Sequence, residues 1–148
     1  MTQPAAKYLV DANVLSETTK PGPHPAVVDW LRRHERELAV DPVVLGELRF
    51  GILILDPGKR RRGLERWFHQ VSETIHCLPW DGETGQRWAQ LLADLRSVGR
   101  AMPIKDSLIA ASALQHGLTV VTRNRRDFEP AGLEIVDPFE WGSSVHEP

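Results

Sequence analysis

The alternation of short apolar segments with amphipathic stretches is the feature that most limits how this chain can fold. Apolar runs of strand length lie at residues 8–10, 38–40, 75–78, 118–122 and 134–136. Between them, apolar residues recur at the three- and four-residue spacing of helices. Strands that alternate with helices favour a parallel sheet covered on both faces. We therefore predict a three-layer α/β/α domain with a mainly parallel central sheet over residues 1–148.

Local signals place several helix ends. Asp41 followed by Pro42 predicts a helix start, because an aspartate caps the first turn and a proline fits its first position. The helix that follows, to about Leu55, is apolar nearly all round and is expected to be buried. Gly117 is predicted to end another helix as a left-handed cap. The predicted helices span residues 26–36, 42–55 and 104–115, with further helices after residues 56–58 and 81–82.

Composition excludes several classes of protein. The single cysteine, Cys77, allows no disulfide within the chain and argues, with only six histidines, against a thiolate zinc site. No stretch has the length and hydropathy of a membrane span, and the polar residues 1–7 give no indication of a signal peptide. We expect a cytoplasmic protein with no membrane association. The net charge of -2 neither indicates nor excludes a nucleic-acid partner, since local patches decide contact.

Acidic and amide side chains stand at the ends of the predicted strands and on two predicted helices. Asp11 follows strand 8–10, and Asn124 and Asp127 follow strand 118–122. Glu47 lies on an apolar helix, and Asp106 lies in the first turn of another. Each has an ordinary alternative role, as a turn residue, a residue at the edge of the core or a helix cap. The carboxyl ends of parallel strands share one edge of the sheet, so we expect these side chains to meet there.

A cluster of carboxylates has consequences for chemistry. Two carboxylates about 5 Å apart repel by roughly 3 kcal/mol at an effective dielectric constant of 20. Such a cluster must therefore take up protons or bind a cation. Ligands that are all oxygen select hard ions such as Mg²⁺ or Mn²⁺, which share their coordination with phosphate groups. The pattern predicts phosphodiester chemistry.

Four sequence segments around these residues resemble a known family. They are residues 9–17 (LVDANVLSE), 46–51 (GELRFG), 106–111 (DSLIAA) and 119–124 (TVVTRN). In this order they resemble the PIN-domain ribonucleases, and within them the VapC-like toxins of VapBC-type toxin–antitoxin pairs. The resemblance extends from Tyr8 to about Pro138 and implies one PIN-like nuclease domain.

The resemblance also implies roles for individual residues. Asp11, Glu47 and Asp106 would form an acidic metal site for Mg²⁺ or Mn²⁺, with Asn124 or Asp127 in the fourth position. Asn124 departs from family members that have an aspartate there. The implied substrate is RNA, cut by an activated water to leave a 5′-phosphate and a 3′-hydroxyl. The implied partners are a cognate antitoxin and a second copy of the chain.

Polar and basic neighbours complete the predicted site. Asn13 and Thr122 are expected to orient the carboxylates. Three arginines after strand 118–122 are predicted to contact RNA phosphates: Arg123, Arg125 and Arg126. The stronger basic run at residues 59–62 is further from the predicted site and is interpreted as a solvated helix start.

Some of these residues are also consistent with other functions. A signalling receiver domain also gathers aspartates at strand ends, but it leaves Glu47 unexplained. A non-catalytic module that binds RNA or an antitoxin would account for Asn124. A phosphatase with Asp11 as nucleophile would require a second aspartate where Asn13 stands.

Overall fold

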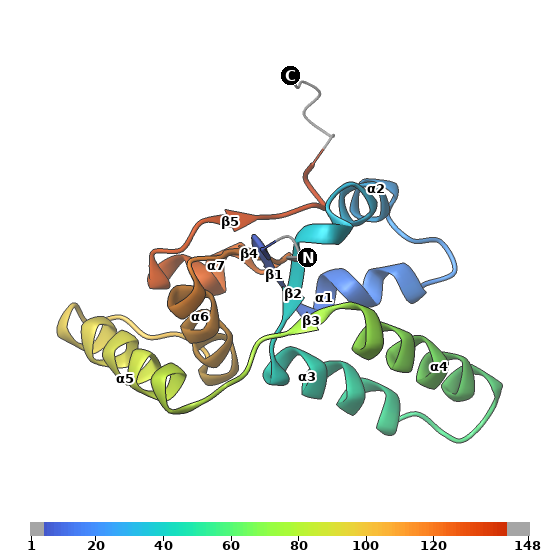
Figure 1. Cartoon of the computed structure of the whole chain (residues 1–148), viewed down its shortest axis with the longest axis horizontal. Coiled ribbons are helices and arrows are strands. Elements are labelled where there is room, and N and C mark those ends of the chain that lie inside the picture. Colours follow the sequence, from blue (N-terminus) through green and yellow to red (C-terminus); the bar gives the residue numbers. More distant parts are fainter. Residues whose placement is uncertain (1–4, 142–148) are drawn as a thin grey trace.

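Five parallel strands form the central sheet of the computed structural model, which describes residues 5–141 (Figure 1). Along the sheet the strands run in the order β3-β2-β1-β4-β5. Their bounds are β1 Tyr8–Val10, β2 Leu38–Val40, β3 His76–Cys77, β4 Thr119–Val121 and β5 Ile135–Val136. The first strand lies in the middle, so the chain builds the sheet outward in one direction and then in the other. The carboxyl ends of β1 and β4 are therefore neighbours.

Helices cover the sheet on two sides, which confirms the predicted three-layer α/β/α arrangement. In Figure 1, α1, α3 and α4 lie on one side of the strands, and α5, α6 and α7 lie on the other. The α-helices are α1 Ala12–Leu15, α2 Pro25–Arg33, α3 Pro42–Leu53, α4 Lys59–Thr74, α5 Gly82–Ser97, α6 Ile104–His116 and α7 Arg125–Phe128. Within the described range, short 3-10 helices follow α1, α2 and α7: η1 Ser16–Thr19, η2 Glu35–Glu37 and η3 Glu129–Ala131.

The predicted helix ends have the expected physical basis. Asp41 accepts a hydrogen bond from the Val44 amide at 2.9 Å, and Pro42 occupies the first turn of α3. Gly117 ends α6 with φ at 67°, a left-handed conformation that suits glycine. These caps mark where α3 begins and where α6 ends.

The core lies between the sheet and the helices. Strand residues Leu9, Val10, Val40, Val120 and Val121 are fully buried, as expected for a sheet covered on both faces. Among the described residues, no helix is long and apolar enough to cross a bilayer.

The prediction that the helix over residues 42–55 is buried all round was wrong for its second half. Phe50, Leu53 and Ile54 are 64%, 47% and 65% exposed. Only one stripe of α3 is buried, Val44, Leu48 and Ile52 at four-residue spacing, and the opposite face of its C-terminal half is exposed. Several other elements are shorter than predicted: helix 26–36 ends at Arg33, and strand 75–78 is reduced to His76–Cys77.

Candidate active site

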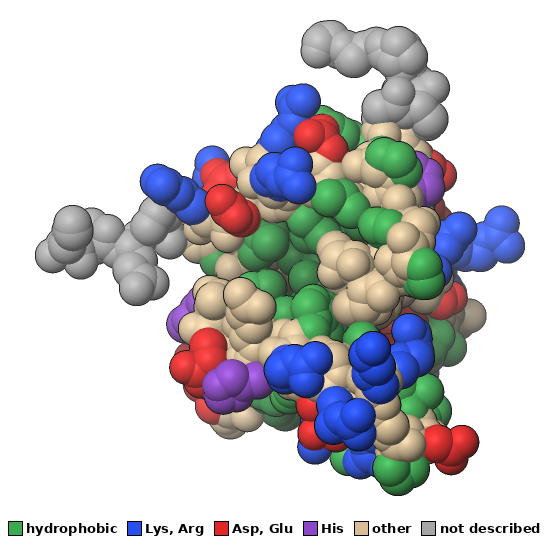
Figure 2. Space-filling model, turned by 90° about the vertical axis from the view of Figure 1, so that its right-hand side faces the viewer, with side chains coloured by type: hydrophobic (Ala, Val, Ile, Leu, Met, Phe, Trp, Pro, Cys, Tyr) green, Lys and Arg blue, Asp and Glu red, His purple; other side chains and the backbone are tan. Residues whose placement is uncertain are grey.

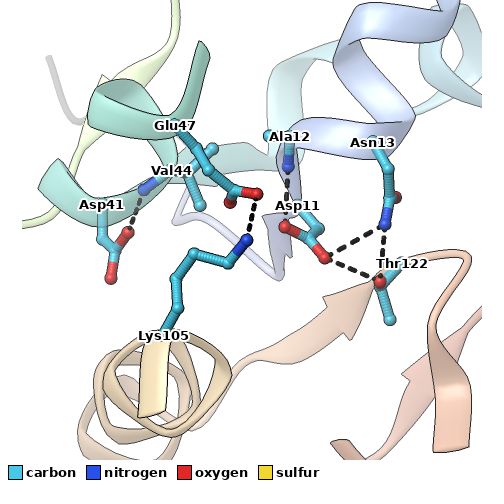
Figure 3. Close-up of polar contacts among 8 residues, drawn as sticks. All are labelled: Asp11, Ala12, Asn13, Asp41, Val44, Glu47, Lys105 and Thr122. Atoms are coloured by element: carbon cyan, nitrogen blue, oxygen red, sulfur yellow. Dashed lines mark hydrogen bonds and ion pairs between the residues drawn. The ribbon is translucent and has the colours of Figure 1, made fainter. Parts of the chain in front are cut away.

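Asp11 is fixed by hydrogen bonds at the carboxyl end of β1. Its backbone N–H donates to the Val121 carbonyl, and its side chain caps α1 by accepting from the Ala12 amide at 2.8 Å. The Thr122 hydroxyl donates to the other carboxylate oxygen at 2.8 Å. The Asn13 side-chain amide donates to the same oxygen at 3.3 Å. The two residues predicted to orient the carboxylates therefore do contact Asp11 (Figure 3).

Burial and nearby groups have opposing effects on the pKa of the Asp11 carboxyl. The side chain is only 3% exposed, and loss of solvent raises the pKa of its carboxyl above the ordinary value. The hydrogen bond from Thr122 opposes this rise in pKa, whereas the nearby charge of Glu47 adds to it. Asp11 is thus a desolvated carboxylate whose charge is supported by directed donors.

Glu47 reaches the same region from α3, and Lys105 meets it from α6 (Figure 3). The Lys105 ammonium donates to Glu47 Oε2 at 2.6 Å. The second oxygen, Glu47 Oε1, is buried and has no hydrogen-bond partner among the described residues. A buried oxygen without a partner is costly, so Oε1 is an acceptor whose hydrogen-bonding capacity is unused among the described residues.

Asp106 lies in the first turn of α6 and is 5% exposed. Burial is the main cause that raises the pKa of its carboxyl from 3.8 to about 6, and the charges of Asp11 and Asp127 raise it further. Lys105 opposes the rise. Asp106 therefore exchanges its proton near neutral pH and responds to the other acids, which indicates that they share one electrostatic environment.

The two candidates for the fourth position differ in their surroundings. Asn124 has an exposed side chain that makes no capping hydrogen bond. Its backbone N–H donates to the Thr122 hydroxyl at 3.0 Å, and its carbonyl accepts from the Asp127 amide at 3.0 Å. Asp127 is half-buried on α7, and its charge raises the pKa of Asp106. The electrostatic contact with the other acids therefore comes from Asp127.

The donor set is suited to a hard cation, although it is not a preassembled cage. Within residues 5–141, no three acidic, histidine or cysteine side chains lie close enough to form a ready metal-binding group. The available donors are carboxylate oxygens, and one of them is buried and has no partner in this part of the chain. Among the described residues, Lys105 is the only cation that is hydrogen-bonded to these carboxylates. This chemistry fits Mg²⁺ or Mn²⁺ and does not fit a soft metal.

Comparison with protein families identifies the chain. The PIN domain family model matches residues 8–132, a range that contains all four acids. The chain is a PIN domain. PIN-domain nucleases generally depend on divalent metal ions, in agreement with the oxygen-rich donor set.

Relatives place this PIN domain among the VapC and FitB toxins. VapC ribonuclease Y4jK of Sinorhizobium fredii is 35% identical over 136 residues, which cover 89% of this chain and 97% of the relative. Toxin FitB of Neisseria gonorrhoeae is 32% identical, with 88% and 97% covered. A solved structure of FitAB bound to the IR36 DNA fragment superposes with a TM-score of 0.85 at 28% identity, with 95% and 98% covered.

A groove of this PIN domain begins at Glu47 and leads away from the candidate site. It has a volume of about 350 Å³ and runs between α1, α3 and α4, from Asn13 and Glu47 to Arg60 and Trp67. Figure 2 views the side of the molecule that carries α1 and α4, and shows Lys and Arg side chains gathered below a hollow with hydrophobic walls. The basic run interpreted from sequence as a solvated helix start therefore contributes Arg60 to the groove that borders the site.

The three predicted RNA-contacting arginines are all exposed but are not equally free. The Arg123 guanidinium lies over the Phe139 ring, 4.3 Å from its centroid. Arg125 donates to the Ile135 carbonyl at 3.3 Å. Both arginines thus help to hold the segment after β4 against residues 135–139. No local sequence pattern indicates these contacts.

Two alternatives considered from sequence are not favoured by this PIN domain. Receiver domains have the strand order 2-1-3-4-5, whereas this sheet is ordered β3-β2-β1-β4-β5. Asn13 donates a hydrogen bond to Asp11, so it orients that carboxylate and does not supply the second acid of a phosphatase. Sequence reasoning missed Lys105, whose position next to Asp106 was the available signal.

Proposed function

We propose that this chain is the toxin of a VapBC-type toxin–antitoxin pair and hydrolyses RNA phosphodiester bonds with Mg²⁺ or Mn²⁺. The observation that carries the proposal is the convergence of Asp11, Glu47 and Asp106, from three separate elements, on one electrostatically coupled site. The relatives named as VapC ribonucleases and toxins support it. The nuclease unit is taken as a single PIN-like domain over residues 1–148.

Asp11, Asp106 and Glu47 are the residues that would hold the metal ion. Glu47 Oε1 has no partner among the described residues, and the pKa of Asp106 is raised. Both observations indicate that the acids have too little positive charge around them, and a divalent cation would supply that charge. When bound, such an ion offsets the carboxylate charges and polarises the phosphate of the substrate. Asp127 is proposed as the fourth acid in preference to Asn124, because its charge acts on Asp106.

The side chains have distinct parts in the reaction. Thr122 and Asn13 hold Asp11 in one rotamer, so that its oxygens face the site. Glu47 is proposed to orient the attacking water or take its proton. The water oxygen forms a bond to phosphorus while the bond from phosphorus to the 3′ oxygen breaks, and that oxygen takes a proton from solvent. The products carry a 5′-phosphate and a 3′-hydroxyl.

RNA must be held beside an acidic centre by nearby cations. Arg126 and Arg60 are exposed and lie on elements next to the site, so they are proposed to contact backbone phosphates. Arg123 and Arg125 can add positive charge near the site while they keep their contacts with Phe139 and the Ile135 carbonyl.

The partners follow from the apolar surface and from the relatives. The exposed Phe50, Leu53 and Ile54 on α3 are proposed to be covered by a cognate antitoxin or by a second copy in a homodimer. The structure of FitAB supports pairing with an antitoxin. The proposed location is the cytoplasm, where RNA and the antitoxin are present.

The test is cleavage of a mixed RNA substrate by Asp106→Asn, with Asp94→Asn as the matched control. Asp94 is an exposed residue of α5 that pairs with Gln90, so its loss should leave cleavage unchanged. Asp106→Asn should reduce the cleavage rate by roughly 100-fold or more, and EDTA should abolish cleavage by the parent. A folded Asp106→Asn protein that cuts RNA as fast as the parent would refute the assignment. A parent that binds RNA without cutting it would favour a non-catalytic module.

A further inference from the structure

Lys105 is a basic residue next to the predicted metal-binding acids. Its side chain extends from α6 toward α3, where the ammonium meets Glu47 Oε2 at 2.6 Å (Figure 3). The hydrogen bond with Glu47, and also the charges of Asp106 and Asp11, raise the pKa of Lys105. The lysine therefore keeps its positive charge and interacts with all three predicted metal-binding residues.

This pair differs from an ordinary surface ion pair elsewhere in the chain. Lys7 and Glu37 also form an ion pair, at 3.0 Å, with a glutamate of nearly the same exposure, 28% against 27% for Glu47. Burial leaves one oxygen of Glu47 without a partner, whereas the structure has no such oxygen on Glu37 among the residues it describes. Lys105 thus neutralises only part of a cluster that still lacks positive charge.

We propose that Lys105 is a positioning residue that acts as a built-in counter-cation: it holds Glu47 before a divalent ion arrives and competes with that ion for the carboxylates. The inference rests on the proposed metal-dependent function. A divalent ion that binds Asp11, Asp106 and Glu47 meets the repulsion of the ammonium, so binding requires the lysine to give up its contact. The Lys105 side chain is 52% exposed, which leaves it room to move away.

The first measurement is Mn²⁺ binding to the RNA-free protein, followed by electron paramagnetic resonance of the free ion. Lys105→Met removes the competing charge and keeps the length of the side chain, so Mn²⁺ should bind roughly tenfold more tightly. Lys105→Arg retains the charge and should restore an affinity close to that of the parent. Lys7→Met breaks the comparable ion pair away from the site and should leave the affinity unchanged.

The second measurement is the thermal midpoint, with EDTA and with excess Mn²⁺. Without metal, Lys105→Met should have a lower thermal midpoint than the parent. The reason is that Lys105 is the only cation, among the described residues, that is hydrogen-bonded to these acids. Added Mn²⁺ should raise the midpoint of this variant more than that of the parent. Lys105→Arg should behave like the parent in both conditions.

Two results would overturn the proposal. If Lys105→Met binds Mn²⁺ no more tightly than the parent and only raises KM for RNA, the lysine is a substrate contact. If Mn²⁺ binding weakens, the lysine assists the ion and does not compete with it. In both cases a parent that binds Mn²⁺ and cuts RNA keeps the proposed function intact. A parent that binds no Mn²⁺ would remove the metal-dependent function and this inference together.

Discussion

Replacement of Asp106 by asparagine should abolish cleavage and at the same time stabilise the metal-free protein. The folded environment raises the pKa of Asp106 from 3.8 to about 6. At about 1.36 kcal/mol per pKa unit, keeping this carboxylate ionised at pH 7.5 costs roughly 3 kcal/mol of folding free energy. Asparagine removes that cost but gives up a favourable charge near the start of α6, worth about 0.5–1 kcal/mol. The net gain should be roughly 2 kcal/mol.

The pH dependence of this gain has a definite sign. Between about pH 4 and pH 6, the folded protein keeps a proton on Asp106 that the unfolded chain has released. The stability of the parent therefore falls as the pH rises through this range, because the folded state binds more protons than the unfolded state. Asparagine does not titrate, so the advantage of the variant should grow from near zero at pH 4 to its full value at about pH 7.

Urea unfolding of both proteins in EDTA, at pH 4.5, 6 and 7.5, measures the difference directly. Asp94→Asn is again the control, since this exposed residue should change the free energy of unfolding by less than about 0.5 kcal/mol. Excess Mg²⁺ should stabilise the parent and not the Asp106→Asn variant. The reasoning is refuted if the variant is no more stable than the parent at pH 7.5, or if its advantage is the same at pH 4.5.

Three further predictions concern single positions. Thr122→Val removes the hydroxyl that donates to Asp11, so it should lower the free energy of unfolding by about 1.5–3 kcal/mol and also lower the cleavage rate. Thr122→Ser keeps a hydroxyl and should retain most of the stability and the activity. Equal behaviour of the two variants in urea unfolding and cleavage assays would contradict this. Asp127→Asn should lower the pKa of Asp106, as measured by NMR titration, and should slow cleavage. Asn124→Ala should change neither the pKa nor the cleavage rate. The reverse result would assign the fourth position of the site to Asn124. Gly117→Ala forces a side chain into a left-handed conformation with no steric neighbour, so thermal unfolding should show a loss of about 1 kcal/mol with activity unchanged.

Much of the fold could be predicted from sequence because its signals are local. The apolar strands around Leu9 and Val120, the Asp41–Pro42 start of α3 and the Gly117 end of α6 all depend on neighbouring residues. The three-layer arrangement then follows from the alternation of elements. The exposed end of α3 was mispredicted because an apolar sequence cannot tell whether neighbouring elements extend far enough to cover it.

The candidate site was predictable in its residues but less so in its contacts. Asp11, Glu47 and Asp106 could be chosen because Asp11 follows an apolar strand, Glu47 lies on an apolar helix and Asp106 lies in the first turn of another helix. The contact between Lys105 and Glu47 joins residues 58 positions apart on different helices, and no local pattern encodes such a pairing. The contact of Arg123 with Phe139 likewise depends on how the chain returns after β5.

The hydrogen bond from Thr122 to Asp11 spans 111 positions of the chain, and β1 completes its pairing only when β4 is present. A ribosome that has synthesised the first hundred residues has not yet made Lys105, Asp106 or the strand that holds Asp11 in place. The proposed site is therefore among the last parts of the fold that can form as the chain is made. A polypeptide that stops before α6 carries Asp11 and Glu47 without Asp106 or the Thr122 hydroxyl.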